Sequence, residues 1–308
     1  MLQGLSAPLP PGALRDVACG LCGSRERRVK FEDGPFSVVT CTQCELTYVT
    51  PRLVDAALLE RVYDEQYWSS DAAKVRGYTD YRADAPLYLR TYERRFSIVE
   101  RHFARPGRVL DVGCAAGYFL SVAQRRGWDV AGYEPSDAIR PEAERRLGAG
   151  RVRGGEFTSA GFEPGSFDLV TYWDVIEHIP DGVAALRAAR ALLKPGGKLL
   201  IETQNIDSRA AKVLGSRWQH YKHAEHIYHY NARTLSDLLG RAGFEVLENK
   251  PWLGGKYVSM GFIAERAGRL HPALSTVLKP LSLLRSKALY VNLFDEMIVV
   301  ARPRAASA

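Results

Sequence analysis

The chain has 308 residues, of which 46% are hydrophobic and 25% are charged, and its formal net charge is +7. This composition is typical of a globular protein with one large core and room for a small additional domain. The sequence has no run of about 18 apolar residues and no signal-peptide pattern, so we expect a cytoplasmic protein without a membrane-spanning helix. Much of the positive charge is arginine scattered along predicted helices, as in Arg94-Arg95, where we expect a solvated surface.

Four of the five cysteines form two Cys-x-x-Cys pairs near the start of the chain: Cys19, Cys22, Cys41 and Cys44. Each pair offers two thiolates from one tight turn, which is the spacing of a structural zinc site. Between the pairs, residues 28–31 and 36–40 predict two short strands joined across Asp33-Gly34, as in a zinc ribbon. Disulfides or a redox-active pair are the alternatives, and a cytoplasmic location disfavours both. We therefore predict a zinc ribbon over residues 1–50.

Residues 51–105 predict a helical linker or lid. Apolar side chains recur at helical spacing over residues 87–103, so this helix should pack on the main domain, and a second helix is predicted over residues 54–63. The intervening stretch is rich in aromatic side chains: Tyr63, Tyr67, Trp68, Tyr78 and Tyr81. These residues predict either a flap over cofactor and substrate, with Tyr78 reaching the substrate, or a helix pair buried on the core.

The rest of the chain is organised around residues 108–120, RVLDVGCAAGYFL. An apolar run predicts a buried strand over residues 109–112, and the small residues that follow leave the backbone open to a ligand before a helix begins. A strand, a small-residue loop and a helix N-terminus form a nucleotide-type site at the carboxyl end of a strand. Glu134 ends the next apolar run, which is the usual place of the acidic residue that holds a ribose.

From residue 108 onward, strand and helix signals alternate, which predicts a parallel sheet covered on both faces. Strands are expected near Val109, Val130 and Val152, and over residues 167–172, 198–202, 244–247 and 293–301. We expect a helix to end at Pro195-Gly196-Gly197. A long connection at about residues 252–292 is apolar but contains Pro272 and Pro280. It predicts an inserted lid or an oligomer contact, with a peripheral membrane contact as the less favoured alternative.

Four runs carry a resemblance to a known family: residues 111–117 (DVGCAAG), 167–170 (FDLV), 173–179 (WDVIEHI) and 193–197 (LKPGG). They resemble bacterial class I S-adenosylmethionine-dependent methyltransferases that carry an N-terminal zinc ribbon and act on polysaccharide or natural-product intermediates. The resemblance covers almost the whole chain. It implies an α/β fold with a Rossmann-like, seven-stranded doubly wound sheet over residues 106–308, whose last strand is antiparallel. Ala115 stands where the family usually has glycine, and Thr203-Gln204-Asn205 stands where Thr-Pro-Asn is commoner.

The same resemblance implies the residues of the site. We assign S-adenosylmethionine binding to Asp111, Gly113, Cys114, Ala115, Gly117, Tyr118, Glu134, Pro135, Glu156, Trp173 and Asp174. Substrate binding is assigned to Tyr78, Tyr221, His223 and Glu225.

Methyl transfer to oxygen or nitrogen releases a proton, which favours a neutral histidine as base. His226 is the first choice because Glu225-His226 matches the family, and His178 is the second. For His178 the alternative is hydrogen bonding at a helix start, and for His220 and His229 a structural role is favoured. A metal site built from His220, His223, Glu225 and His226 is disfavoured because the spacing lacks the His-Glu-x-x-His order. A magnesium site built from Asp174 and Asn205 is disfavoured as well.

The predicted function is methyl transfer to a hydroxyl, amine or carbon of a small molecule, with structural Zn²⁺ in the ribbon. An RNA methyltransferase is the first alternative. It is disfavoured because Tyr172-Trp173-Asp174 replaces the Asn/Asp-Pro-Pro-Tyr of amine-methylating base enzymes, and because Cys114, the only spare thiol, lies in the cofactor loop. Four thiolates on one Zn²⁺ would also reduce the net charge from +7 to about +5. A non-catalytic S-adenosylmethionine-binding protein is the second alternative, and no oligomeric state is predicted.

Overall fold

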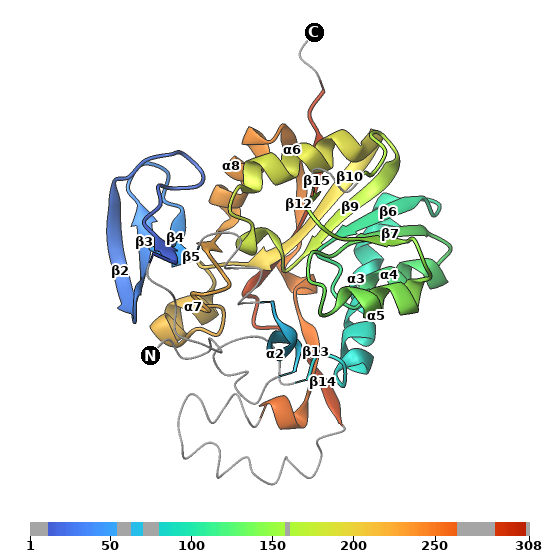
Figure 1. Ribbon diagram of the computed structural model, residues 1–308, viewed down its shortest axis with the longest axis horizontal. Helices are drawn as coiled ribbons and strands as arrows, with labels where there is room; N and C mark the ends of the chain where they lie inside the picture. Colours follow the sequence, from blue (N-terminus) through green and yellow to red (C-terminus); the bar gives the residue numbers. More distant parts are fainter. Residues whose placement is uncertain (1–11, 54–62, 70–79, 158–160, 264–286, 306–308) are drawn as a thin grey trace.

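The computed structural model describes residues 12–53, 63–69, 80–157, 161–263 and 287–305. At its centre lies a seven-stranded sheet of order β12-β15-β10-β9-β6-β7-β8 (Figure 1). Its strands are β6 (Arg108–Val112), β7 (Asp129–Tyr133), β8 (Val152–Arg153), β9 (Phe167–Trp173), β10 (Leu193–Gln204), β12 (Phe244–Asn249) and β15 (Glu296–Pro303). The strands from β10 to β8 are parallel, whereas β15 runs antiparallel to both β10 and β12. The predicted Rossmann-like sheet and its antiparallel last strand are confirmed.

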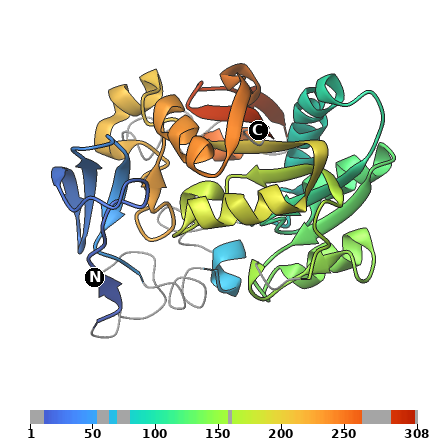
Figure 2. The ribbon, with the colours of Figure 1, turned by 90° about the horizontal axis from the view of Figure 1, so that it is seen from above.

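Helices cover both faces of this sheet (Figure 2). They are α3 (Ala85–His102), α4 (Tyr118–Arg125) and α5 (Arg140–Leu147) on one face, and α6 (Gly182–Leu192) and α8 (Ala232–Arg241) on the other. Successive side chains of a strand point to opposite faces, so Val109 packs with α3 and α4 while Leu110 packs with α6 and α8. The helix predicted over 87–103 is therefore α3, and residues 54–62 of the helix predicted over 54–63 lie outside the described residues.

The end of α6 differs from the prediction. The helix stops at Leu192 and β10 begins at Leu193, so Pro195-Gly196-Gly197 lies within the strand instead of between helix and strand. The pairing of β10 with β9 is interrupted between Leu193 and Lys198, which absorbs the proline and the two glycines as an irregularity. Pro195, Gly196 and Gly197 therefore form a bulge in β10, and α6 ends three residues before Pro195.

The ribbon is a second sheet of order β11-β4-β3-β2 at one end of the molecule (Figure 2). Its strands are β2 (Arg27–Asp33), β3 (Phe36–Cys41), β4 (Thr47–Thr50) and β11 (Tyr228–His229). The two predicted strands are β2 and β3, and β4 adds a third antiparallel strand. The fourth comes from the histidine-rich segment of the main domain, where Tyr228 pairs with Tyr48. The sheet thus crosses the predicted domain boundary at residue 50.

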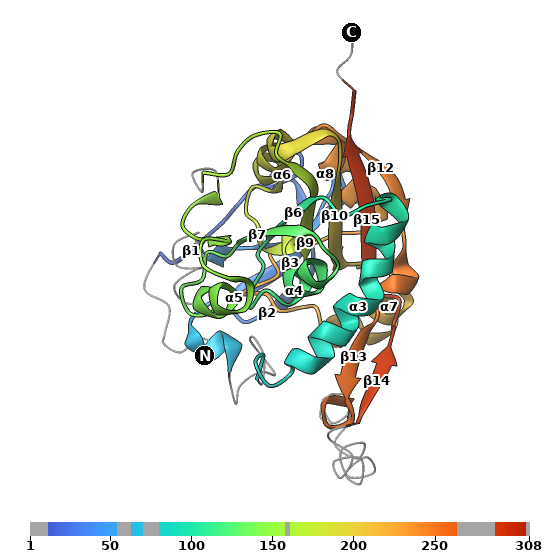
Figure 3. The ribbon, with the colours of Figure 1, turned by 90° about the vertical axis from the view of Figure 1, so that its right-hand side faces the viewer.

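The connection between β12 and β15 is built on a hairpin, β13 (Lys256–Ser259) and β14 (Ala288–Val291). Figure 3 shows the hairpin beside the end of α3, beyond the edge of the main sheet. The backbone N–H of Tyr257 donates to the Thr91 hydroxyl at 2.9 Å, which fastens β13 to α3. Residues 264–286 of the predicted lid lie outside the described residues, with Pro272 and Pro280 among them.

The remaining elements are short: β1 (Leu14–Arg15), β5 (Arg52–Leu53), α2 (Glu65–Trp68), α7 (Arg209–Leu214) and the 3-10 helices η2 (Ile176–His178), η3 (Gly215–Arg217) and η4 (Pro251–Leu253). Within the described ranges, no helix has the length and apolar character needed to cross a bilayer.

Helix α3 buries one arginine. Arg95 is 3% exposed, and its guanidinium lies 2.5 Å from a carboxylate oxygen of Glu202 in β10 and 3.3 Å from one of Glu296 in β15. Its neighbour Arg94 is exposed. The prediction of a solvated surface is therefore right for Arg94 and wrong for Arg95, because only the second faces the sheet.

Candidate functional site

The predicted cofactor loop joins β6 to α4. Gly113, Ala115 and Gly117 have φ angles of +73°, +47° and +76°, so the loop bends sharply at each of them. A Cβ on Gly113 would lie 2.7 Å from the Val175 side chain, which makes glycine necessary there. The N–H groups of Gly113 and Cys114 both donate to the Tyr133 carbonyl, at 2.8 and 3.0 Å, and hold the loop against β7. The loop lies where the carboxyl ends of parallel strands meet, as a nucleotide site requires.

Two buried carboxyl groups flank this loop. Glu134 accepts hydrogen bonds from the N–H groups of Ala115 and Ser136, each at 2.8 Å, and so links the loops that follow β6 and β7. Asp111 accepts a hydrogen bond from the Thr171 hydroxyl at 2.7 Å. Burial raises the pKa of Glu134 to about 7 and that of Asp111 to about 8. Both groups therefore titrate near neutral pH in the ligand-free protein.

Cofactor binding should weaken as the pH falls below about 7, the pKa of Glu134. Ribose hydroxyls donate to a carboxylate, and a protonated Glu134 has lost part of that acceptor capacity. The dissociation constant of S-adenosylmethionine, measured by calorimetry from pH 8 to 5.5, should rise with a limiting slope of about one log unit per pH unit. Glu134→Gln should flatten the profile over this pH range. An unchanged profile in the variant would assign the titration to another group.

Ala115→Gly should raise the free energy of unfolding by up to about 1 kcal/mol, because alanine at φ +47° carries a strain that glycine lacks. Ala116 next to it is fully buried and is not among the residues with positive φ, so Ala116→Gly should destabilise by about 1 kcal/mol. Denaturant unfolding of the two variants measures both changes. Changes of the same sign would mean that the left-handed backbone at Ala115 is not strained.

Three of the predicted cofactor residues point into the protein. The Sγ atom of Cys114 packs so closely on Gly132 that a Cβ there would lie 2.7 Å from it. The Tyr118 hydroxyl donates to the Tyr81 carbonyl at 3.3 Å. The ring of Trp173 packs against Phe119, with ring centroids 5.0 Å apart. Cofactor contact by their side chains stays a prediction.

The other three predicted cofactor residues follow strands of the sheet. Pro135 is half-buried after β7, and Glu156 is exposed after β8. Asp174 follows β9 with a φ of +53°, and its N–H donates to the Glu202 carbonyl at 3.2 Å. All three lie at the same edge of the sheet as the loop, and their contact with a cofactor stays a prediction.

The aromatic stretch packs over the cofactor loops. Tyr67, Trp68 and Tyr81 form a buried cluster with residues of both loops: Ala116, Tyr118 and Ile139. The Trp68 indole N–H donates to the Ser136 hydroxyl at 3.3 Å, beside Glu134. These contacts bury the described part of the stretch against both loops, and the choice between the flap and the buried helix pair stays a prediction. Tyr78, predicted to reach the substrate, lies outside the described residues.

The two predicted catalytic histidines lie together. The ring centroids of His178 and His226 are 4.7 Å apart, with the rings nearly perpendicular. His178 ends η2, so the helix-start alternative does not apply; its Nδ1 lies 2.9 Å from the Glu225 carbonyl oxygen and 2.8 Å from the Tyr63 hydroxyl. Burial lowers the pKa of His178 to about 4 and that of His226 well below its usual range. Both imidazoles are neutral at physiological pH.

The other histidines of the segment serve different contacts. His220 Nε2 lies 3.4 Å from an Asp295 carboxylate oxygen, and His223 Nε2 lies 3.3 Å from one of Asp33 in the ribbon. His229 is fully buried in β11. These contacts join β15 and the ribbon to the histidine-rich segment. They point His220 and His223 to different partners, so the four residues His220, His223, Glu225 and His226 do not form one metal site.

Three of the predicted substrate residues also face the ribbon or the interior. The Tyr221 ring packs on Phe31 of β2, with centroids 4.8 Å apart, and His223 packs on the same ring at 5.7 Å. The Glu225 side chain is 1% exposed, and its carboxylate lies 3.4 Å from the Lys222 ammonium. Contact of Tyr221, His223 and Glu225 with a substrate stays a prediction.

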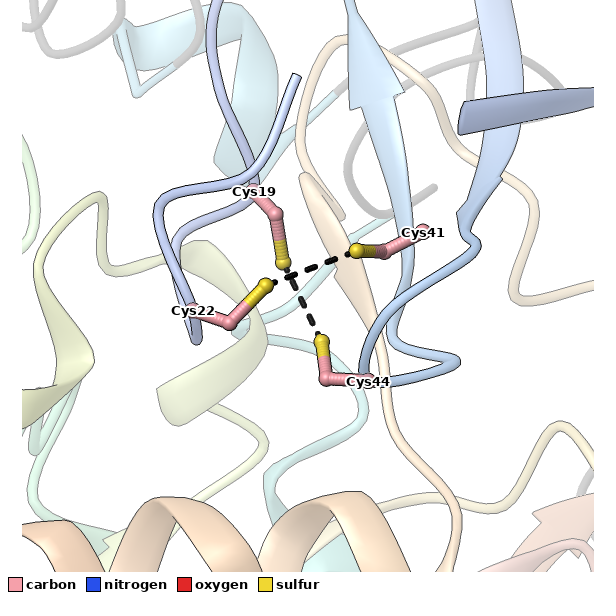
Figure 4. A group of neighbouring side chains, drawn as sticks. All are labelled: Cys19, Cys22, Cys41 and Cys44. Atoms are coloured by element: carbon pink, nitrogen blue, oxygen red, sulfur yellow. Dashed lines mark hydrogen bonds between the residues drawn. The ribbon is translucent and has the colours of Figure 1, made fainter. Parts of the chain in front are cut away.

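The four ribbon cysteines point their sulfur atoms at one another (Figure 4). Cys19 and Cys44 are 3.4 Å apart at Sγ, and Cys22 and Cys41 are 3.5 Å apart. A tetrahedral Zn²⁺ with Zn–S bonds of about 2.3 Å separates its sulfurs by about 3.8 Å, so the four thiols fit this ion. These separations are much longer than a disulfide bond of about 2.05 Å. A Cβ on Gly20 would lie 2.0 Å from the Tyr228 hydroxyl, so the first knuckle is pressed against β11.

No role was assigned from the sequence to Glu177 after β9, to Glu202 near the end of β10 or to Glu296 at the start of β15. Within the part of the chain that the structure describes, two further groups bring their ligand atoms within 4.8 Å of one another: Glu177, His178 and His226, and Asp174, Glu202 and Glu296. A glutamate inside an otherwise apolar strand, as in Leu199-Leu-Ile-Glu202, was the available signal for the second group.

Comparison with known proteins gives a family match. A profile described as a methyltransferase domain matches residues 81–249, which is more than half of the 308 residues. The matched region runs from the start of α3 to the end of β12 and contains the cofactor loop and the histidine pair.

Among curated proteins, the ubiquinone biosynthesis O-methyltransferase of Xanthomonas euvesicatoria is 36% identical over 132 residues, which cover 37% of this chain and 55% of the relative. The enzyme of that name from Ralstonia nicotianae is 37% identical over 118 residues, covering 36% and 50%. The chain thus spans about half the length of the curated relatives it matches. A solved S-adenosylmethionine-dependent methyltransferase from Thermotoga maritima is 19% identical with a TM-score of 0.48, covering 73% of this chain and 95% of that one.

Proposed function

The chain belongs to the methyltransferase-domain family, and from this membership we propose that it transfers the methyl group of S-adenosylmethionine to an oxygen of a small molecule. One observation carries the proposal: the loop at residues 113–117, Glu134 and His178 follow β6, β7 and β9, whose carboxyl ends meet at one edge of the sheet, and His226 packs on His178. Oxygen is the acceptor we favour because the curated relatives are named O-methyltransferases. A sugar or natural-product intermediate is the substrate class that the resemblance implies.

The loop residues and Glu134 would hold the cofactor, which supplies an electrophilic methyl group. Glu134 already binds two backbone N–H groups and has lone pairs left for ribose hydroxyls. Methyl transfer is an in-line displacement, so much of the rate depends on positioning the acceptor. The aromatic cluster of Tyr67, Trp68 and Tyr81 supports the proposal because it covers the loop and would exclude water.

A hydroxyl acceptor has to lose its proton. His226 is our first candidate to receive it and His178 is the second, since both rings are neutral at physiological pH. Their burial opposes formation of an imidazolium ion, so proton uptake needs a compensating contact in the complex. Two neutral imidazoles also have a second use, as metal ligands.

We further propose that Cys19, Cys22, Cys41 and Cys44 hold one structural Zn²⁺. Four protein sulfurs would close the coordination shell, so this ion would stabilise the fold and take no part in chemistry. The contact of Gly20 with Tyr228 supports this role, since the zinc would fix the knuckle against the strand that follows His226.

The test is incubation of the purified chain with S-adenosylmethionine and a panel of hydroxylated small molecules, with mass-spectrometric detection of products that gain one methyl group. His226→Ala should lower kcat by about 10²-fold or more with little change in cofactor affinity. His102→Gln is the matched control, because His102 lies at the end of α3 and pairs with Glu248 at 2.7 Å. Full activity in His226→Ala would remove His226 from the mechanism, and cofactor binding without any product would favour a non-catalytic protein.

A further inference from the structure

Three side chains with metal-binding groups converge just beyond β9. Glu177 and His178 come from η2, and His226 comes from the histidine-rich segment almost 50 residues later. One ligand atom of each lies within 4.8 Å of the others. Ligand atoms bound to the same transition metal lie about 3 to 3.5 Å apart, so small side-chain rotations close the group around an ion.

Two of these ligand groups have unused atoms in the interior. Glu177 is fully buried; one carboxylate oxygen accepts from the Thr203 hydroxyl at 3.0 Å, and the other, Oε1, has no hydrogen-bond partner among the described residues. His226 is 8% exposed, and its Nδ1 also has no partner among them. A buried polar atom without a partner costs about 1–3 kcal/mol, so a ligand that satisfies both atoms would be bound favourably.

The third residue, His178, is oriented as a metal ligand usually is. Its Nδ1 lies 2.9 Å from the Glu225 carbonyl oxygen, and a carbonyl can only accept, so Nδ1 carries the proton. Nε2 of the neutral ring is then unprotonated and has a lone pair that can bind a metal ion. Metal-binding histidines typically donate their other N–H to a backbone carbonyl or carboxylate, which fixes the ring and the tautomer.

We infer that Glu177, His178 and His226 bind a divalent transition-metal ion, separate from the zinc of the ribbon. Two imidazoles and one carboxylate suit Mn²⁺, Fe²⁺ or Zn²⁺, whereas Mg²⁺ prefers oxygen ligands alone. Three protein ligands leave coordination positions open, as in catalytic sites. In this arrangement His226 is a ligand of the ion and not the general base, and the proton of the acceptor hydroxyl passes to solvent.

The inference rests on the proposed methyl transfer for what the ion does. A hydroxyl bound to the ion has a lowered pKa, so its O–H bond breaks and the proton passes to solvent. The oxygen then forms its bond to the methyl carbon as the S–C bond of the cofactor breaks, which leaves S-adenosylhomocysteine. The substrate class is thus a hydroxylated molecule that can bind a cation.

The second carboxylate group, Asp174, Glu202 and Glu296, does not offer a comparable site. Arg95 lies 2.5 Å from Glu202, and the Lys256 ammonium lies 2.8 Å from Glu296. These cations occupy the place that a metal ion would take, so the group is an ion-pair network.

Mn²⁺ titration followed by electron paramagnetic resonance tests the site, because free and bound Mn²⁺ give different signals. Zinc-loaded wild-type chain should bind one further equivalent of Mn²⁺. Glu177→Gln and His226→Gln should each weaken this binding at least 100-fold. Their zinc content and circular dichroism should be unchanged, and His102→Gln should bind Mn²⁺ as the wild type does. Absence of Mn²⁺ binding in the wild type, or equal binding in a folded Glu177→Gln variant, would overturn the inference.

Activity separates this inference from the proposed function. Methyl transfer that persists at full rate after chelation, with zinc retained, would overturn the metal site and leave the methyltransferase assignment and the base His226 in place. Mn²⁺ binding lost in Glu177→Gln, together with no product on any acceptor, would support the site and contradict the proposed function.

Discussion

Arg95→Met should lower the free energy of unfolding by about 3–5 kcal/mol. The guanidinium is buried and lies 2.5 Å from Glu202 and 3.3 Å from Glu296, so its removal leaves two carboxylates in the core. The Lys256 ammonium, 2.8 Å from Glu296, and the His220 imidazole, 3.8 Å from it, remain beside them. Removing one partner of a buried ion pair costs more than the pair contributes, because the remaining charge is desolvated without compensation. Denaturant unfolding followed by circular dichroism measures the loss.

Arg94→Met is the matched control. Arg94 is exposed on the same helix and lies over the Tyr290 ring at 4.2 Å, so its loss should cost less than about 1 kcal/mol. Burial raises the pKa of Glu202, and a protonated Glu202 needs no cation, so the deficit of Arg95→Met should shrink as the pH is lowered. Equal losses in the two variants, or a deficit that does not change with pH, would contradict this explanation.

Serine in place of both Cys22 and Cys41 should abolish zinc binding and unfold the ribbon. The metal-binding free energy of a four-thiolate site is on the order of 10 kcal/mol, and a three-stranded sheet of this size has little core of its own. Amide hydrogen exchange in β2, β3 and β4 should lose its protection, and exchange in β11 should rise because its partner strand is lost. Metal analysis and hydrogen-exchange mass spectrometry record the two effects.

Cys114→Ala provides the comparison for the cysteine variant, since Cys114 lies in the cofactor loop and outside the cysteine cluster. This variant should keep one zinc per chain and the protection of the ribbon. Native protection of β2 to β4 in the zinc-free double variant would show that the ribbon folds without metal.

The main sheet could be predicted because buried parallel strands form short, continuous apolar runs, as around Val109 and Val130. The cofactor loop could be predicted for a related reason: a run of small residues directly after such a strand has few other uses. The four cysteines were equally informative, because two Cys-x-x-Cys pairs predicted a four-sulfur cluster, and the fold brings sulfurs of the first pair within 3.5 Å of sulfurs of the second.

Other features arise from contacts that no local pattern contains. Tyr228–His229 is too short for any periodicity, so its pairing with β4 depends on the position of the whole histidine-rich segment. Arg95 differs from Arg94 only in the side of α3 that it occupies, so the amino-acid composition alone could not show that one of the two arginines is buried. The approach of His226 to His178 likewise depends on two loops that meet only in the folded chain.

During synthesis, β4 leaves the ribosome long before its partner strand β11 has been made. About 180 residues separate the two strands, so at 5–20 residues per second the ribosome needs roughly 10–35 s to supply the partner of β4. Until then β4 presents an open strand edge, which is a site for pairing with other chains. Zinc bound early would keep the ribbon folded during this interval. In cells depleted of zinc, we therefore expect aggregates of this protein to form before the amount of folded protein decreases measurably.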